Sequence, residues 1–225
     1  MILYAIPTPL GGPASVLSGE VLQKIRELRD FVVENAKSAR AFLADAGLTV
    51  RDLNIVEIGK AQDPLKPLRE GRPLGLLSEA GCPAIADPGA ALVEAAHEAG
   101  FRVVPLVGPS SITLALMASG LEGQRFAFCG YLPRDKVERE KRIRELEQRS
   151  RRERETEIFI ETPYRSDALW DALLSACNEK TRVCVAADLT LPTEWVRTRT
   201  VAQWRAAGAA IGRRPAVFLL LARPG

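Results

Sequence analysis

Hydrophobic and polar positions along the chain follow two alternating periods. Short apolar runs, typical of buried strands, are separated by segments whose apolar residues recur every three or four positions, as on one face of a helix. In the first half, this pattern predicts strands at 2–6, 30–34, 53–58, 73–78 and 102–107. It predicts helices at 19–28, 37–47, 89–100 and 110–120, with a polar connection at 60–71. Strands separated by helices favour a parallel sheet with right-handed crossovers.

The pattern changes near residue 120. Strands are predicted at 126–132, 155–161, 182–190, 194–200 and 215–222, and helices at 135–155, 164–178 and 201–208. The third and fourth of these strands have little chain between them, which favours antiparallel pairing in a mixed sheet. The segment SGLEGQ supplies two glycines at the change. We therefore predict two α/β domains, 1–120 and 121–225, the first mostly parallel and the second mixed.

Composition narrows the function classes. An apolar content of 47% over 225 residues can fill a real core, and a net charge of +3 does not by itself indicate nucleic acid. Four widely spaced cysteines and a single histidine, His97, disfavour a metal site. We see no export signal, and the apolar runs are far shorter than the roughly 20 residues that span a bilayer. We expect a cytoplasmic protein with reduced thiols, no metal and no membrane partner.

The helix predicted at 135–155 is strongly charged. Its apolar positions are few, and opposite charges lie three or four residues apart, which stabilises a solvated helix. However, KRIREL and RSRRER together contain seven arginines and lysines. A plain solvated face and a contact with an RNA backbone both remain open.

Three loops that follow predicted strands are rich in glycine and proline: PTPLGGPAS at 7–15, SEAGCPAIADPG at 78–89 and VGPSS at 107–111. In an open parallel sheet, ligands bind beyond the carboxyl ends of the strands. Glycine lets a ligand approach the main chain. Proline fixes the φ angle and has no N–H, so carbonyl groups are left to face the ligand. Such loops suit a positively charged ligand that is held by carbonyl and carboxylate oxygens.

None of these loops has the glycine spacing that binds nucleoside triphosphates or NAD. Tight turns over a compact core are the alternative interpretation for each loop taken alone.

The order of motifs resembles that of the tetrapyrrole methylase superfamily, and most of all the branch that contains ribosomal RNA small-subunit methyltransferase I. The motifs are PTPLGG, VEN-x-K-S-A-R, SEAGCPAIADPG, VPLVGPSS, ASGL, F-x-F-x-GYLPR and ETPYR. The resemblance runs from residue 3 to residue 221.

This resemblance implies a two-domain homodimer that binds S-adenosylmethionine in a cleft between the domains and transfers its methyl group, in that branch to the 2′-oxygen of a cytidine ribose. It implies that the cofactor contacts these residues of the first domain: Pro9, Leu10, Gly81, Cys82, Ile85, Ser110 and Ser111. From the second domain it implies contacts with Ile160, Ala187 and Ala216.

The chain also departs from the pattern of the ribosomal branch. It has ENAKSAR at 34–40 for E-D-T-R-x-T-R and SEAGCP at 78–83 for S-D-A-G-[TM]-P. It has ETPYR at 161–165 for E-x-P-H-R and AADLTL at 186–191 for A-R-E-L-T-K. An arginine and a lysine are lost, which puts the same RNA acceptor in question.

A hydroxyl acceptor needs a base to remove its proton. Glu34 and Glu161 each end a predicted strand, where a carboxylate can act as the base or orient a substrate. We take both as candidate catalytic residues, with Lys37 and Arg40 steering the substrate. An ion pair of either glutamate with Lys37, Arg40 or Arg165 is the structural alternative.

Other residues of chemical interest have simpler interpretations. We interpret His97 as a surface or packing residue and Asp87 as the cap of the following helix. Nothing in the sequence lowers the pKa of Cys82, so we do not expect a nucleophile there. Trp170, Trp195 and Trp204 are expected in the core or in a dimer interface.

Three functions follow. The first is a methyltransferase that uses S-adenosylmethionine and acts on RNA or on an uncharacterised acceptor. The second is a methyltransferase of a small or tetrapyrrole-like molecule, and the third is a catalytically silent protein that binds RNA or the ribosome.

Overall fold

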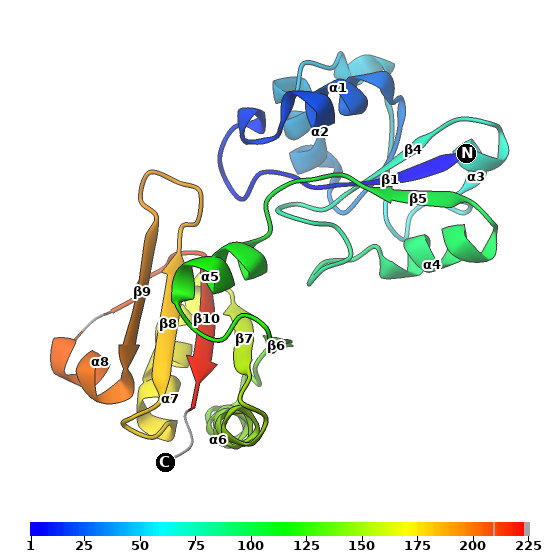
Figure 1. Ribbon diagram of the computed structural model, residues 1–225. Coiled ribbons are helices and arrows are strands. Elements are labelled where there is room, and N and C mark those ends of the chain that lie inside the picture. The colour runs from blue at the N-terminus through cyan, green and yellow to red at the C-terminus, as the bar shows by residue number, and fades with distance from the viewer. Residues whose placement is uncertain (209, 223–225) are drawn as a thin grey trace. The chain divides into compact units, whose positions relative to one another are not determined.

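The computed structural model describes residues 1–208 and 210–222, and the chain divides into two compact units, 1–110 and 111–225 (Figure 1). The boundary lies between residues 110 and 111 rather than at the predicted 120. The reason is helix α5 (Ser111–Ser119), which packs on strands of the second sheet through Ile112 and Ala115. Its sequence did not show which sheet it would cover.

The first unit contains a five-stranded sheet of order β3-β2-β4-β1-β5, and all its pairings are parallel, as predicted. The strands are β1 (Ile2–Ile6), β2 (Asp30–Val33), β3 (Asn54–Glu57), β4 (Leu74–Leu77) and β5 (Arg102–Pro105). The helices are α1 (Gly19–Glu27), α2 (Ala36–Asp45), α3 (Lys66–Arg69) and α4 (Ala90–Glu98). The short helix α3 lies in the segment that had been predicted as a polar connection.

Alternating side chains of this sheet form two apolar layers. Phe31 and Val33 of β2 pack with helices α1 and α2, whereas Val32 between them packs in the layer of α3 and α4. Side chains at the helix starts satisfy free amide groups, since Ser18 accepts from the amide of Val21. The sheet is thus covered on both faces, and its strand ends are left for the connecting loops.

The second unit has a mixed sheet of order β6-β7-β10-β8-β9, as predicted. Strand β6 runs parallel to β7, and the other pairings are antiparallel, including the predicted pair β8 and β9. The strands are β6 (Phe126–Tyr131), β7 (Thr156–Glu161), β8 (Arg182–Ala187), β9 (Trp195–Thr200) and β10 (Ala216–Leu221). The helices besides α5 are α6 (Lys136–Glu153), α7 (Ser166–Ala176) and α8 (Val201–Ala207).

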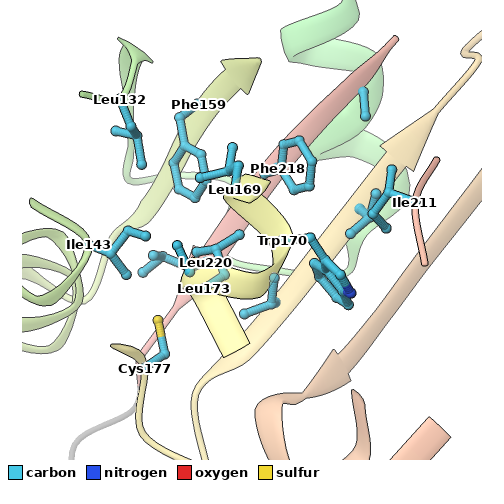
Figure 2. Packing of buried hydrophobic residues seen from close by; sticks show 14 of the residues in the cluster. Leu132, Ile143, Phe159, Leu169, Trp170, Leu173, Cys177, Ile211, Phe218 and Leu220 are labelled. Carbon is cyan, nitrogen blue, oxygen red and sulfur yellow. The ribbon is translucent and has the colours of Figure 1, made fainter. Parts of the chain in front are cut away.

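The core of the second unit lies on the face of the sheet that α6, α7 and α8 cover, as Figure 2 shows in part. Trp170 and Trp204 meet edge to face with ring centroids 5.0 Å apart. Phe159 and Phe218, on neighbouring strands, stack at 6.2 Å. The prediction that Trp170 and Trp204 are packing residues is confirmed, because their side chains are only 2% and 1% exposed.

The charged helix α6 is only partly a solvated helix. Ile143 and Leu146 are buried as expected, whereas Val137 is exposed. The polar residues Glu147 and Ser150 are buried as well. Glu147 accepts hydrogen bonds from the amide of Asn178 and the hydroxyl of Thr181. This helix therefore fixes a polar network under its charged surface.

Within the residues described, no helix combines the length and the apolar character that crossing a membrane requires.

Candidate cofactor-binding site

The three glycine- and proline-rich loops of the first unit are neighbours in space. They follow β4, β1 and β5, and these strands are adjacent in the sheet order. Because the strands are parallel, their carboxyl ends lie at one edge of the sheet. The loops 7–15, 78–89 and 107–111 therefore meet at this edge, as the sequence predicted.

The first two loops are joined by main-chain hydrogen bonds. The amide of Thr8 donates to the carbonyl of Gly81 at 2.9 Å, and the amide of Gly81 donates back to the carbonyl of Thr8 at 3.0 Å. The hydroxyl of Thr8 donates to the carbonyl of Ser78, and the hydroxyl of Ser78 donates to the carbonyl of Gly81. Thr8 and Ser78 are buried. The sequence did not indicate their role, because only their positions at the ends of predicted strands distinguished them.

Glycines allow the third loop to approach the other two. A Cβ atom on Gly108 would lie 2.2 Å from Cγ of Pro7, so no larger residue fits there without a shift. Gly81 has a φ of +84°, and a Cβ atom there would lie 3.2 Å from Leu10. The thiol of Cys82 donates to the carbonyl of Pro109 at 3.5 Å. The expected residues Leu10, Gly81 and Cys82 therefore lie in one rigid cluster.

Burial raises the pKa of the Cys82 thiol, which favours its neutral form. This agrees with the interpretation of Cys82 as a small packing residue rather than a nucleophile.

The loop after β4 also contains backbone strain. Ala84 and Ala86 both have a φ of +65°, a left-handed conformation that costs L-residues about 1–2 kcal/mol each. Ile85 lies between them with its side chain half exposed. Strain of this kind persists where surrounding contacts hold it, and it is concentrated at ligand sites. Nothing in the sequence of two alanines indicated it.

Asp87 does not cap helix α4, so this prediction is wrong. The residue at the cap position is Gly89, with φ +133°, and no side chain bonds to the first amides of the helix. The glycine conformation turns the chain into the helix without an acceptor side chain. Instead, Asp87 lies among other carboxylates near the loop.

Glu34 is connected to the same loop. The amide of Glu79 donates to the Glu34 carboxylate at 2.9 Å, and the Ser38 hydroxyl donates to the Glu79 carboxylate at 3.0 Å. Within the described part of the chain, Glu34 forms no salt bridge, so the ion-pair interpretation does not hold for it. Lys37 and Arg40 are exposed on α2, whose cap is Asn35.

Partial burial raises the pKa of Asp87 from its ordinary 3.8 to about 6. The carboxylates of Glu34 and Glu79 add to this effect by repulsion, whereas the nearby Ser78 hydroxyl opposes it. The edge of the sheet therefore concentrates negative charge beside the three loops.

We expect Asp87→Asn to stabilise the protein at pH 8 and to have little effect at pH 4. Because the folded protein binds this proton more tightly than the unfolded chain, the free energy of unfolding falls as pH rises from about 4 to about 6. After allowance for solvent screening, the gain at pH 8 should be about 1 kcal/mol. Urea unfolding of both proteins at the two pH values measures it. A variant that is less stable at pH 8 would contradict this electrostatic interpretation.

In the second unit, the three expected cofactor contacts lie at one edge of the sheet. Ala216 pairs with both Ala187 and Glu161, and Ile160 precedes Glu161 on β7. The side chains of Ala187 and Ala216 are buried in the core, whereas Ile160 lies on the other face of the strand. Their contact with a cofactor stays a prediction.

Glu161 forms the ion pair that was its structural alternative. Its carboxylate accepts from Nε of Arg165 at 2.9 Å and from Nη2 at 2.5 Å, and also from the amide of Thr162. Arg165 contacts both carboxylate oxygens, and Glu161 is only 5% exposed. Of the two candidate bases, Glu34 is the one with a carboxylate available beside the loops.

The remaining predicted residues have less distinctive surroundings. Pro9 is half-buried in the first loop, Ser110 ends the first unit, and Ser111 begins α5. His97 is exposed near the end of α4, as the surface interpretation expected.

Comparison with known proteins agrees with this geometry. The family model of tetrapyrrole (corrin/porphyrin) methylases matches residues 4–204. The chain is 34% identical over 207 residues to ribosomal RNA small subunit methyltransferase I of Escherichia coli O157:H7, covering 89% of this chain and 70% of the relative. It is 32% identical over 205 residues to the protein of the same name from Vibrio cholerae, covering 90% and 69%.

Solved structures with a similar fold include uroporphyrin-III-C-methyltransferase from Thermus thermophilus. That structure has a TM-score of 0.58 and 21% identity, with 98% of this chain and 94% of that chain covered. The methyltransferase CobJ gives a TM-score of 0.65 at 20% identity, with 100% and 96% covered. The family model spans most of the residues, and the motifs and the parallel sheet with its three glycine- and proline-rich loops agree with it. The chain therefore belongs to the tetrapyrrole methylase family and is a methyltransferase.

Proposed function

We propose that the protein transfers a methyl group from S-adenosylmethionine to RNA of the small ribosomal subunit. The main support for this cofactor is that loops 7–15, 78–89 and 107–111 meet at one edge of the first sheet. The support for the acceptor is a sequence identity of 34% and 32% to two small subunit rRNA methyltransferases over most of the chain.

The residues at this edge fit S-adenosylmethionine. The close approach at Gly81 and Gly108 leaves main-chain groups where side chains would otherwise stand. The carboxylates of Glu34, Glu79 and Asp87 supply negative charge, which favours a cationic ligand over a phosphate. We infer that Pro9, Leu10, Gly81, Cys82, Ile85, Ser110 and Ser111 hold the cofactor.

When bound, S-adenosylmethionine supplies a methyl group on a positively charged sulfur that leaves as a neutral thioether. The protein then has to align the acceptor oxygen with the methyl carbon, and rigid loops suit that task. The proton of a ribose hydroxyl must also be removed. We assign this step to Glu34, whose carboxylate is oriented by the amide of Glu79. Lys37 and Arg40 would attract the RNA backbone.

A small or tetrapyrrole-like acceptor is the second candidate. The solved structures of similar fold include enzymes whose names specify tetrapyrrole substrates. The arginine and the lysine that are missing at 186–191 also weaken the case for the ribosomal acceptor. A silent RNA-binding protein is the third, and absence of methyl transfer to any acceptor would favour it.

Transfer of a labelled methyl group tests the proposal. The protein is incubated with labelled S-adenosylmethionine and either small ribosomal subunits or a metabolite extract. We expect label in RNA, in nucleotides that resist alkaline hydrolysis because the 2′-oxygen is methylated. Label in small molecules alone would replace RNA with the second candidate.

Glu34→Gln is expected to lower the transfer rate about 100-fold without weakening cofactor binding, because the glutamine oxygen can still accept from Glu79 while it cannot take a proton. Glu20→Gln, at an exposed position of α1, is the matched control. Equal rates for the two variants would remove Glu34 as the base.

The homodimer stays a prediction, and sedimentation equilibrium of the full chain measures it directly.

A further inference from the structure

Tyr164 is an unusually exposed aromatic residue in the second unit. It lies in the 3-10 turn Pro163–Arg165 between β7 and α7, and 82% of its surface is accessible. The turn is held at both ends, because the amide of Arg165 donates to the carbonyl of Thr162 and the Arg165 guanidinium binds Glu161. The ring is therefore presented to solvent from a fixed backbone.

Arg213 lies over this ring. Its guanidinium carbon is 5.5 Å from the ring centroid, within the range of a cation–π contact. The loop that carries it is anchored to the first turn of α7. The amide of Gly212 donates to Asp167 at 2.8 Å, and the hydroxyl of Ser166 lies 3.2 Å from the carbonyl oxygen of Thr162 and 3.4 Å from that of Arg214. The pairing of Tyr164 with Arg213 thus has main-chain support on both sides.

The charges around the pair are unequal. Arg165 is neutralised by Glu161, and Arg214 lies 3.4 Å from Asp188 while covering the ring of Trp195. Over the described ranges 1–208 and 210–222, Arg213 forms no salt bridge. Its positive charge is available to an external anion, next to an aromatic face that is available to an external ring.

A free guanidinium beside an exposed aromatic ring matches one nucleotide. Unpaired bases stack on tyrosine rings and on guanidinium planes, and phosphate oxygens accept from arginine. A duplex hides its base faces, so the pair selects a single strand.

We propose that Tyr164 and Arg213 form a platform for one unpaired nucleotide of single-stranded RNA, with the base on the ring and the phosphate on the guanidinium. This proposal rests on the proposed function, in which RNA is the acceptor. It identifies unpaired RNA as the form of the acceptor that the second unit recognises. The platform lies at the sheet edge that also contains Ile160, Ala187 and Ala216.

Fluorescence anisotropy with the full chain tests the platform. The probes are a labelled oligouridine of about 12 nucleotides, a length within single-strand site sizes, and an RNA duplex of equal length. We expect tighter binding of the single strand. Tyr164→Ala should weaken that binding about tenfold, whereas Tyr164→Trp should retain it. Arg213→Ala should weaken binding and reduce the slope of log affinity against log salt by about 0.7.

Two control variants match these changes elsewhere in the protein. Lys24→Ala removes a cation that lies 5.7 Å over the ring of Tyr4, in the first unit. Phe126→Ala removes an exposed aromatic residue at the opposite end of the second sheet. Both should bind the single strand as the unchanged protein does.

The outcomes separate this proposal from the proposed function. If RNA is methylated but Tyr164→Ala and Arg213→Ala bind it normally, the platform is wrong and the RNA acceptor stands. If the unchanged protein binds the duplex as tightly as the single strand, the platform is also wrong. If it neither binds nor methylates RNA, both proposals fail together.

Discussion

Gly81→Val is expected to weaken S-adenosylmethionine binding about 100-fold in a protein that still folds. Gly81 has a φ of +84°, where an L-residue is strained, and its added side chain would meet Leu10 and the carbonyl of Pro109. The two hydrogen bonds to Thr8 would have to shift with the loop. A misplacement of about 1 Å at a site that works by positioning can reduce activity by about two orders of magnitude, and we expect a similar loss of cofactor affinity here. Isothermal titration measures the affinity.

Gly71→Val is the matched control for this change. Gly71 has a φ of +83°, almost the same as Gly81, but a Cβ atom there meets nothing within 4 Å. It lies in the turn before β4, at the opposite end of that strand from the loop. Both variants should lose stability in urea unfolding through the positive φ, and Gly81→Val should lose more because of its contact with Leu10. Only Gly81→Val should lose cofactor affinity. Equal affinities would remove Gly81 from the site.

Arg149→Met is expected to destabilise the protein by about 3 kcal/mol, the largest effect we predict on stability. Arg149 of α6 donates through both Nε and Nη2 to the carboxylate of Glu157 on β7. Glu157 is 0% exposed, and its carboxylate also accepts from the Cys129 thiol, whose pKa burial raises to about 11. Without Arg149, this buried carboxylate has no ion-pair partner among residues 1–208 and 210–222. Urea unfolding measures the loss.

A double-mutant cycle distinguishes the charge from the packing of Arg149. Adding Glu157→Gln to Arg149→Met should recover more than half of the lost stability, because a neutral amide needs no cation. Arg152→Met, at an exposed position of the same helix with a surface partner in Glu153, should change stability by less than about 0.5 kcal/mol. If the double variant is no more stable than Arg149→Met, packing rather than charge explains the effect.

Most of the fold was predictable from hydrophobic periodicity. Every predicted strand is present, because runs such as those of β4 and β10 are buried on both faces and carry an uninterrupted apolar signal. The domain boundary was not predictable in the same way. Helix α5 is apolar nearly all round, so its sequence did not indicate a preferred face or the sheet that it covers.

The site was predictable at the level of loops and less so at the level of side chains. Glycine and proline marked the three loops because they permit close main-chain approach, and the structure brings those loops together. The buried hydroxyls of Thr8 and Ser78 were missed, since a hydroxyl at a strand end looks the same whether it is solvated or bonded. Asp87 was wrongly predicted as the helix cap, because Gly89 precedes α4 without a side-chain cap. The φ angle of Gly89 allows this start, and the sequence does not show that angle.

Hydrogen exchange of the full chain with and without S-adenosylmethionine is the most direct test of the central claim, that the three loops of the first unit hold a cationic sulfur cofactor. We predict slower amide exchange in peptides from 7–15, 78–89 and 107–111 on addition of the cofactor, with no change in α6. Binding that leaves all three loops exchanging at their original rates, or the absence of binding, would contradict the claim.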